Sequence, residues 1–172
     1  MPRILVCSDS HGRADLLALA YDQQPKAEVL VFLGDGLGDA ALFRYSGKEH
    51  YLVKGNCDGP QWDYPIWQEF TLADQKVVCT HGHFSQEFMK ETKKIICTHG
   101  HQAFVKHSLD ELLRRAKEHR ADLVLYGHTH VPRVDYEDGV QLFNPGSIHA
   151  GEYGFVDVTP AGIFCQNLKV RK

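Results

Sequence analysis

The rest of the chain is arranged around one segment, Leu-Val-Leu-Tyr-Gly-His-Thr-His, at residues 123–130. Its four apolar residues predict a short buried strand, and Gly127 permits a sharp backbone turn directly after that strand. In an extended segment alternate side chains share a face, so His128 and His130 are expected side by side. Two imidazoles placed together at a strand end suit metal ligation. The alternative is a pair of solvated loop histidines.

Three earlier segments repeat this pattern of an apolar run followed by a polar loop. Strands are predicted at residues 3–8, 29–33 and 51–53, and they are followed by Asp9-Ser10-His11-Gly12, Gly34-Asp35-Gly36 and Gly55-Asn56-Cys57-Asp58. Helical segments lie between these units, which favours an α/β fold with a largely parallel sheet. Ligands of such folds bind at the carboxyl ends of the strands, where all of these polar loops are expected.

The C-terminal half adds one helix and two pairs of strands. Ser108 and Glu111 predict a capping box at the start of the helix, whose apolar stripe is Leu109, Leu112, Leu113 and Ala116. Antiparallel strands follow at residues 133–136 and 140–143, joined by an Asp-Gly turn. The last two strands are predicted near residues 154–158 and 163–168. Between them and the earlier pair, Asn144-Pro145-Gly146-Ser147 forms a polar loop that we expect to support the site.

An internal repeat lies in the middle of the chain. Residues 68–83 and 86–101 both begin with Gln-Glu-Phe and both end with Cys-Thr-His-Gly-His. Each copy reads as a hairpin whose second strand leads into Thr-His-Gly-His, and the first copy is expected to turn at residues 73–75. Two copies do not make a solenoid, so we interpret them as a local tandem duplication of which one copy occupies a given place in the sheet.

Composition limits the class of protein. The chain has 172 residues, 43% of them apolar, which suits a single domain spanning residues 1–172. A net charge of −3 without a Lys/Arg stripe argues against nucleic-acid binding. No apolar run approaches the roughly 20 residues of a membrane span, and no signal peptide is evident. The five cysteines lack a C-x-x-C pair, which favours reduced thiols and a cytoplasmic location.

The polar groups at the predicted strand ends form a mixed oxygen and nitrogen set without a thiolate. The set comprises Asp9, His11, Asp35, Asn56, His128, His130 and one histidine from a Thr-His-Gly-His copy. Seven such groups exceed the needs of one first-row ion and suit two, bridged by a carboxylate. Paired cations lower the pKa of a shared water and neutralise phosphate charge, which is typical of phosphoryl chemistry.

In this order the motifs resemble those of the calcineurin-like metallophosphoesterases, and in particular the small prokaryotic phosphodiesterases of YfcE type. The similarity extends over essentially the whole chain. It implies a four-layer α/β-β/α sandwich of two mixed sheets and a centre of two metal ions between the sheet edges. Carried over by motif, the first ion would be held by Asp9, His11, Asp35 and His130. The second would be held by Asp35 as the bridge, together with Asn56, His128 and the Thr-His-Gly-His histidine.

Two departures from the family pattern shape the expected chemistry. Cys57 stands where the family usually has a histidine that helps to protonate the leaving oxygen. Because a thiol with a pKa near about 8.5 is a poor general acid, we predict a preference for diesters, or for esters with acidic leaving groups, over alkyl monoesters. The duplication is the second departure. His99 is favoured over His81 because only 29 residues separate it from His128, although His81 lies in the copy that makes the better hairpin.

Together these observations predict a phosphodiesterase that hydrolyses phosphate diesters with water activated by two divalent ions. We assign catalytic roles to Asn56, Asp58 and His128, and we favour Mn²⁺ over Ni²⁺, Fe²⁺ and Zn²⁺. The expected substrate is a small phosphate ester, with no membrane partner, and the resemblance implies a homodimer. The alternatives are a phosphomonoesterase and a non-catalytic interaction scaffold, since a retromer subunit shares the fold. His101 could line the substrate entrance, as could His83, and His149 is read as a surface residue.

Overall fold

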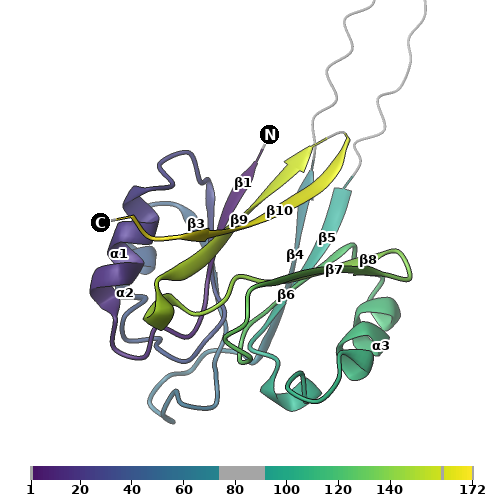
Figure 1. The fold of residues 1–172 in the computed structure, drawn as a ribbon, viewed down its shortest axis with the longest axis horizontal. Coiled ribbons are helices and arrows are strands. Elements are labelled where there is room, and N and C mark those ends of the chain that lie inside the picture. Colours follow the sequence, from purple (N-terminus) through teal and green to yellow (C-terminus); the bar gives the residue numbers. More distant parts are fainter. Residues whose placement is uncertain (1, 74–91, 160, 172) are drawn as a thin grey trace, which may run out of the picture.

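The computed structural model describes residues 2–73, 92–159 and 161–171, in which two five-stranded sheets pack face to face (Figure 1). The first sheet has the order β10-β9-β1-β2-β3. Its strands are β1 (Arg3–Cys7), β2 (Val29–Phe32), β3 (Glu49–Leu52), β9 (Glu152–Thr159) and β10 (Gly162–Lys169). The second has the order β4-β5-β6-β8-β7. Its strands are β4 (Trp67–Ala73), β5 (Thr92–Thr98), β6 (Leu123–Tyr126), β7 (Arg133–Glu137) and β8 (Val140–Asn144).

Helices cover the outer faces of the two sheets. The first sheet packs against α1 (Ala14–Asp22) and α2 (Ala41–Tyr45), and the second packs against α3 (Asp110–Glu118) (Figure 1). Short 3₁₀ turns follow β5 at η1 (His101–Ala103) and β8 at η2 (Ile148–Ala150). The layers therefore run helix, sheet, sheet, helix, which confirms the expected four-layer sandwich. No helix in the described ranges is long and apolar enough to span a bilayer.

Alternation along the central strands explains why the sheets are covered on both sides. In β1, Ile4 and Val6 point into the core between the sheets, whereas Leu5 and Cys7 face the helices. In β6, Leu123 and Leu125 enter the same inter-sheet core, and the intervening side chains face α3. Successive side chains of a strand leave opposite faces, so a continuous apolar run is what a strand buried on both faces requires.

Both sheets are mixed, which confirms the fold that the family resemblance implies and corrects the largely parallel sheet expected from the strand and loop pattern alone. β1-β2, β2-β3, β5-β6 and β6-β8 are parallel pairs, and the four other pairs, β1-β9, β9-β10, β4-β5 and β7-β8, are antiparallel. The crossover from β5 through α3 to β6 and the turn between β7 and β8 are confirmed. The antiparallel pairs involve the outer strands of each sheet. The central parallel strands therefore have their carboxyl ends at one common edge, and the polar loops lie at that edge.

The start of α3 differs from the predicted capping box. The helix begins after Leu109, and Ser108 Oγ accepts a hydrogen bond from the Asp110 N–H at 3.0 Å. The Glu111 carboxylate accepts hydrogen bonds from Arg114 and Arg115 instead of reaching back to the cap. Basic partners one turn ahead outcompete a backbone donor for this side chain because the attraction is charge-assisted.

The duplicated segment contributes one hairpin assembled from both copies. β4 belongs to the first copy and β5 to the second, and the two strands pair antiparallel with Trp67 opposite Thr98. The predicted turn, His81 and His83 fall within or adjoin residues 74–91 and lie outside the described residues. Among the described residues, the sheet thus holds the first strand of the first copy and the second strand of the second copy.

Candidate metal centre

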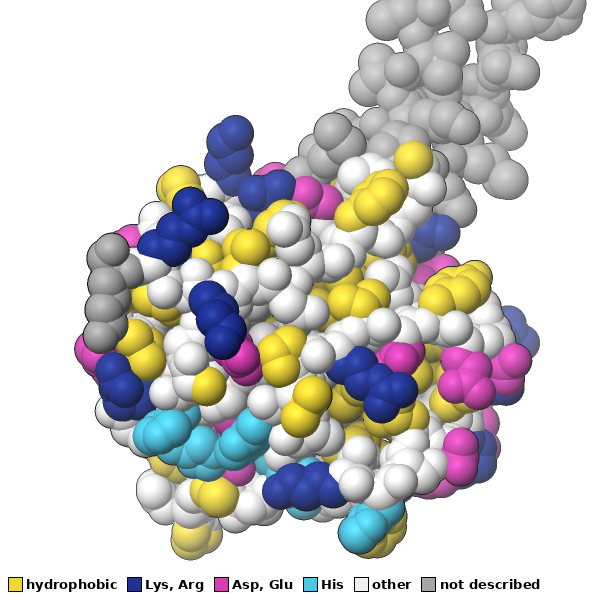
Figure 2. Space-filling model, in the orientation of Figure 1, with side chains coloured by type: hydrophobic (Ala, Val, Ile, Leu, Met, Phe, Trp, Pro, Cys, Tyr) yellow, Lys and Arg dark blue, Asp and Glu magenta, His cyan; other side chains and the backbone are white. Residues whose placement is uncertain are grey.

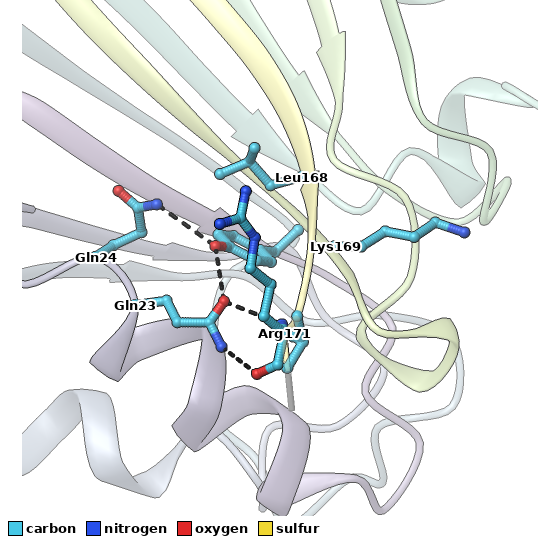
Figure 3. Close-up of a pocket in the computed structure, with 7 residues that line it drawn as sticks. Gln23, Gln24, Leu168, Lys169 and Arg171 are labelled. Carbon is cyan, nitrogen blue, oxygen red and sulfur yellow. Dashed lines mark hydrogen bonds between the residues drawn. The ribbon is translucent and has the colours of Figure 1, made fainter.

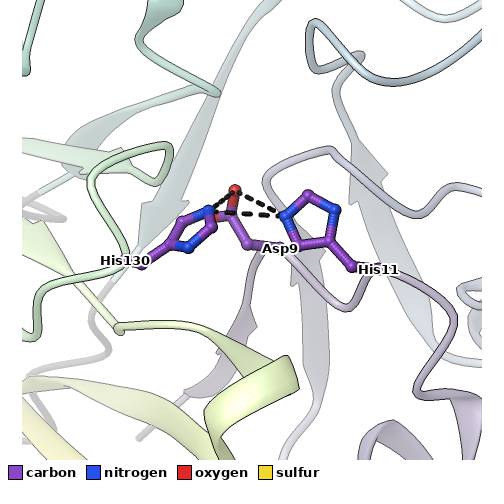
Figure 4. A group of neighbouring side chains, drawn as sticks. All are labelled: Asp9, His11 and His130. Carbon is purple, nitrogen blue, oxygen red and sulfur yellow. Dashed lines mark hydrogen bonds and ion pairs between the residues drawn. The ribbon is translucent and has the colours of Figure 1, made fainter.

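The first group of candidate ligands contains Asp9, His11 and His130, which follow β1 and β6 (Figure 4). Asp9 Oδ1 lies 3.1 Å from His130 Nε2 and 3.9 Å from His11 Nε2, and the two Nε2 atoms are 3.4 Å apart. The Asp9 side chain is fully buried, whereas those of His11 and His130 are 30% and 46% exposed. One anionic oxygen and two imidazoles thus converge on a point that is open to solvent.

The second group contains Asp35, His99 and His128, which follow β2, β5 and β6. Asp35 Oδ2 lies 3.4 Å from His99 Nε2, and the rings of His99 and His128 are 4.8 Å apart between centroids. His99 is fully buried and also contacts Asp9, whose Oδ1 is 3.1 Å from its Nε2. The two groups therefore adjoin, and all six side chains come from loops at strand carboxyl ends on both sheets.

The two histidines of the Gly-His-Thr-His stretch are not side by side as predicted. His128 belongs to the second group and His130 to the first. Both residues have left-handed backbone conformations, with φ of 67° and 59°, so the extended geometry that the prediction assumed ends with β6. The backbone turns at these two residues, and the glycine before them serves another purpose. A Cβ on Gly127 would lie 2.0 Å from Ser8 Oγ, which means that two loops touch there.

Left-handed backbone is shared by several of the candidate ligands. Asp9, His11 and Asp35 adopt φ values between 44° and 58°, in addition to the two histidines after β6. Asp and His tolerate this region better than bulky residues, yet each instance costs free energy unless the surroundings fix it. Such conformations concentrate at functional sites, and here they direct side chains from different loops toward one place.

Asp58 fixes the loop that carries Asp35. Its carboxylate accepts hydrogen bonds from the backbone N–H groups of Asp35, Gly36, Leu37 and Gly55 at 2.8–2.9 Å. Both oxygens of the Asp58 carboxylate bind the protein's own backbone, and the catalytic role expected from sequence stays a prediction. The loops after β2 and β3 are thereby joined.

The Asn144-Pro145-Gly146-Ser147 loop supports the site, as expected. The Asn144 side-chain amide donates to Gly127 O and to Thr129 Oγ1, both at 3.0 Å. Ser147 Oγ donates to the Asp9 carbonyl at 2.9 Å. Asn144 and Ser147 are buried, so these bonds hold the loops after β1 and β6 in a fixed relation.

Without a bound cation, the pKa values at the site favour a cationic imidazole at His99 and a neutral imidazole at His128. Burial alone would lower the pKa of His99, but hydrogen bonds to Asp35 and Asp9 outweigh it and raise that pKa to about 9. The pKa of His128 falls to about 4 because of burial and the neighbouring positive charge on His99. Burial opposes ionisation of Asp9 and Asp35, yet the imidazolium of His99 holds both carboxyl pKa values below the usual range. Without a cation, the proton on His99 neutralises charge between the carboxylates.

Asn56 and Cys57 lie at the exposed margin of the second group. Asn56 is exposed, and its amide nitrogen donates to Cys57 Sγ at 3.3 Å. The Cys57 backbone N–H donates to Asp35 Oδ1 at 2.7 Å, and its Sγ forms a third close group with His11 and Asp35. Desolvation and the nearby Asp35 carboxylate raise the pKa of the Cys57 thiol. Cys57 is exposed and adjoins the ligands, so the alternative interpretation of its sequence position, a small buried residue, is wrong.

Two further histidines adjoin the site. His101 Nδ1 lies 3.2 Å from His99 Nδ1, which agrees with a place at the entrance. His149, read as a plain surface residue, is exposed, but its ring lies 6.2 Å from that of His11 and its backbone N–H donates to the Asp9 carbonyl at 3.2 Å. Its position two residues after Ser147 was the signal that could have found it. Figure 2 shows histidine side chains gathered in a row on this face.

A separate pocket lies between the end of α1 and the C-terminal segment (Figure 3). Gln23 and Gln24 line it with Tyr153 and residues 168–171. The Gln23 amide bonds both the carbonyl and the N–H of Arg171, and the Gln24 amide donates to Tyr153 at 3.4 Å. The two glutamine amides thus bond other groups that line this pocket, and none of the predicted site residues lines it.

The comparisons with known proteins agree with this geometry. The profile of the calcineurin-like phosphoesterase superfamily domain matches residues 2–159. The probable metallophosphoesterase YsnB of Bacillus subtilis is 30% identical over 147 residues, covering 84% of this chain and 74% of that protein. The phosphodiesterase YfcE of Escherichia coli K12 is 27% identical over 187 residues, covering 91% and 88%.

Solved structures show the same fold. A predicted phosphoesterase from Streptococcus pneumoniae superposes with a TM-score of 0.71 at 27% identity, covering 98% of this chain and 89% of that one. Vps29 from Entamoeba histolytica, solved with Zn²⁺, gives a TM-score of 0.67 at 16% identity, covering 98% and 99%, a likeness that shows the fold alone. The profile match over most of its length establishes that this chain belongs to the calcineurin-like phosphoesterase superfamily.

Proposed function

We propose that the chain is a metal-dependent phosphodiesterase that uses two divalent cations to hydrolyse small phosphate diesters. The observation that carries this proposal is the meeting of two ligand groups, Asp9 with His11 and His130 and Asp35 with His99 and His128, around a shared contact between Asp9 and His99. Carboxylate oxygens and imidazole nitrogens suit first-row divalent ions. The donor set therefore fits the metal centre that the family implies.

In the proposed centre, each cation is held by its own set of side chains, with one carboxylate shared between them. Asp9, His11, Asp35 and His130 would hold one cation, and Asp35, Asn56, His99 and His128 the other, with Asp35 shared. When bound, the cations lower the pKa of a coordinated water and neutralise negative charge on phosphate oxygens. We favour Mn²⁺, while Ni²⁺, Fe²⁺ and Zn²⁺ suit the same nitrogen and oxygen ligands. Asp58 and Asn144 keep the supporting loops in place, and the exposed sides of His11 and His130 leave the substrate a path from solvent.

The preference for diesters rests on Cys57. Its thiol lies at the exposed margin of the site, and desolvation together with the Asp35 carboxylate raises its pKa, which makes it a weaker acid than an ordinary cysteine. A weak acid gives little help to an alkoxide leaving group, whereas a diester with an acidic leaving group needs little help. Aryl diesters are therefore the expected substrates in preference to alkyl monoesters.

Hydrolysis assays on the metal-stripped chain test the proposal. An aryl diester and an aryl monoester are each supplied with and without Mn²⁺, and we expect Mn²⁺-dependent turnover that is faster on the diester. His99→Ala should abolish this turnover, while His50→Ala, which removes an exposed histidine of β3, should not. Faster monoester cleavage would support a phosphomonoesterase, and no metal-dependent turnover on either ester would support a non-catalytic scaffold.

A further inference from the structure

Cys57 lies in a third group of metal-ligating atoms that contains sulfur. Its Sγ, one nitrogen of His11 and one carboxylate oxygen of Asp35 all lie within 4.8 Å of one another. The thiol is exposed, whereas Cys7 and Cys97 are buried in the core. Among the described residues, this is the group that offers sulfur, nitrogen and oxygen together.

Hydrogen bonds hold the thiol close to the carboxylate. The Cys57 N–H donates to Asp35 Oδ1 at 2.7 Å, and Asp58 bonds the backbone N–H groups of both Asp35 and Gly55. A Cβ on Gly34 would lie 2.5 Å from Gly55 N, so the two loops are in direct backbone contact. The packing of the loops after β2 and β3 therefore explains where the Cys57 sulfur lies, without any movement of the side chain.

The third group overlaps the other two in its ligands. It shares His11 with the first group and Asp35 with the second, and Cys57 alone is new. Thiolate ligands select soft and borderline ions such as Zn²⁺ and Cd²⁺, whereas Mn²⁺ prefers oxygen and nitrogen. His11 and Asp35 cannot be full ligands of two differently placed ions at once. An ion bound through the Cys57 sulfur would therefore compete with the ions held by oxygen and nitrogen ligands alone.

We propose that His11, Asp35 and Cys57 form a binding position for a thiophilic divalent cation, distinct in its ligands from the two positions of the proposed phosphodiesterase centre. As the Sγ–metal bond forms, the thiol proton leaves to solvent, so the charge of the site changes by one less than the charge of the ion. Cys57 would then determine which metals the chain accepts. This inference does not depend on hydrolysis, because it concerns binding alone.

Co²⁺ is the probe that reports sulfur ligation directly. The metal-stripped full chain carrying Cys79→Ser is titrated with Co²⁺, so that the cysteine of the first repeat copy cannot contribute. We expect a near-ultraviolet thiolate-to-Co²⁺ charge-transfer band that is absent when Cys57→Ser is added and is retained when Cys165→Ser is added instead. Circular dichroism checks that each variant is folded.

Affinities provide a second readout. Cys57→Ser should weaken Cd²⁺ binding by about 10-fold or more, since the loss of even a supporting group around a metal has an effect of this size. The affinity for Mn²⁺ should change by less than about 2-fold, because sulfur is a poor ligand for that ion. A Co²⁺ complex without the charge-transfer band, a band that persists in Cys57→Ser, or equal losses of Cd²⁺ and Mn²⁺ affinity would overturn the proposal. None of these results would bear on whether the chain hydrolyses diesters with Mn²⁺.

Discussion

The two ligand groups of the centre differ in how deeply they are placed. His99 and Asp35 are fully or almost fully buried, and His99 contacts both carboxylates, whereas His11 and His130 are about a third to a half exposed. A buried ion pair that loses one partner leaves an uncompensated charge, while an exposed one is relieved by water. His99 and Asp35 are therefore expected to contribute to the stability of the fold as well as to metal binding, and the exposed His11 and His130 to metal binding alone.

The largest effect is expected from His99→Ala. In the metal-free protein this change leaves the Asp9 and Asp35 carboxylates facing each other without a cation, so unfolding should become easier by about 3–5 kcal/mol. Urea denaturation of the metal-free protein measures the change. His50→Ala is the matched control because His50 is exposed. A change below about 1 kcal/mol for His99→Ala would contradict the stabilising role of the buried group.

The stability of the metal-free protein should depend on pH, because His99 and His128 have shifted pKa values in the folded chain. The pKa of His99 is raised to about 9 from about 6.5 in the unfolded chain, so its contribution, on the order of 3 kcal/mol, is fully present below pH 6.5 and is lost as pH rises through 9. The pKa of His128 is lowered to about 4, so the unfolded chain binds more protons between pH 4 and 6.5, and stability rises with pH in that window.

Stability of the metal-free protein should thus be greatest near pH 6.5. Urea denaturation from pH 4.5 to 9.5 checks this, with His99→Ala as the variant that should lose the decline at alkaline pH. A decline of equal steepness in that variant would assign the effect to another group.

A smaller effect is expected from Asp58→Ala, which removes the acceptor of four backbone N–H groups. The free energy of unfolding should fall by about 2 kcal/mol, and metal affinity by about 10–100-fold, because Asp35 is no longer held. Asp58→Asn should recover only part of the affinity, since an amide has one accepting oxygen. Isothermal titration with Mn²⁺ measures the affinities, and Asp138→Ala, which removes an exposed carboxylate paired with Lys117, is the control.

The smallest effect on stability is expected from His130→Ala, in the exposed group. The free energy of unfolding should change by no more than about 0.5 kcal/mol, while Mn²⁺ affinity should fall by about 10-fold or more. Denaturation and titration of the same sample separate the two quantities. A stability loss as large as that of His99→Ala would remove the difference between the groups.

The order of the elements and the residues that meet were accessible from sequence because they follow local rules. Apolar runs such as Leu123–Tyr126 mark strands buried on both faces, and the polar residues after them must gather where parallel strands end. The exact direction of each side chain was not accessible. His128 and His130 belong to different groups because both adopt left-handed backbone conformations that no strand periodicity predicts.

Contacts between distant loops explain the remaining differences. From sequence, Asp58 is a candidate catalytic carboxylate, and only the structure shows that it accepts hydrogen bonds from four backbone N–H groups. His149 is interpreted from sequence as a surface residue, and only the structure shows that η2 places its ring near that of His11. Likewise, Cys57 adjoins His11 only because the loops after β1, β2 and β3 meet. Each of these relations joins segments far apart in the chain, so spacing along the sequence carries no direct signal of them.

Anomalous diffraction from crystals of the Mn²⁺-loaded protein tests the central claim most directly. We predict two manganese peaks about 3.5–4 Å apart, one beside Asp9, His11 and His130 and the other beside Asp35, His99 and His128. A single peak, or peaks at residues outside these two groups, would contradict the assignment of a centre that holds two cations.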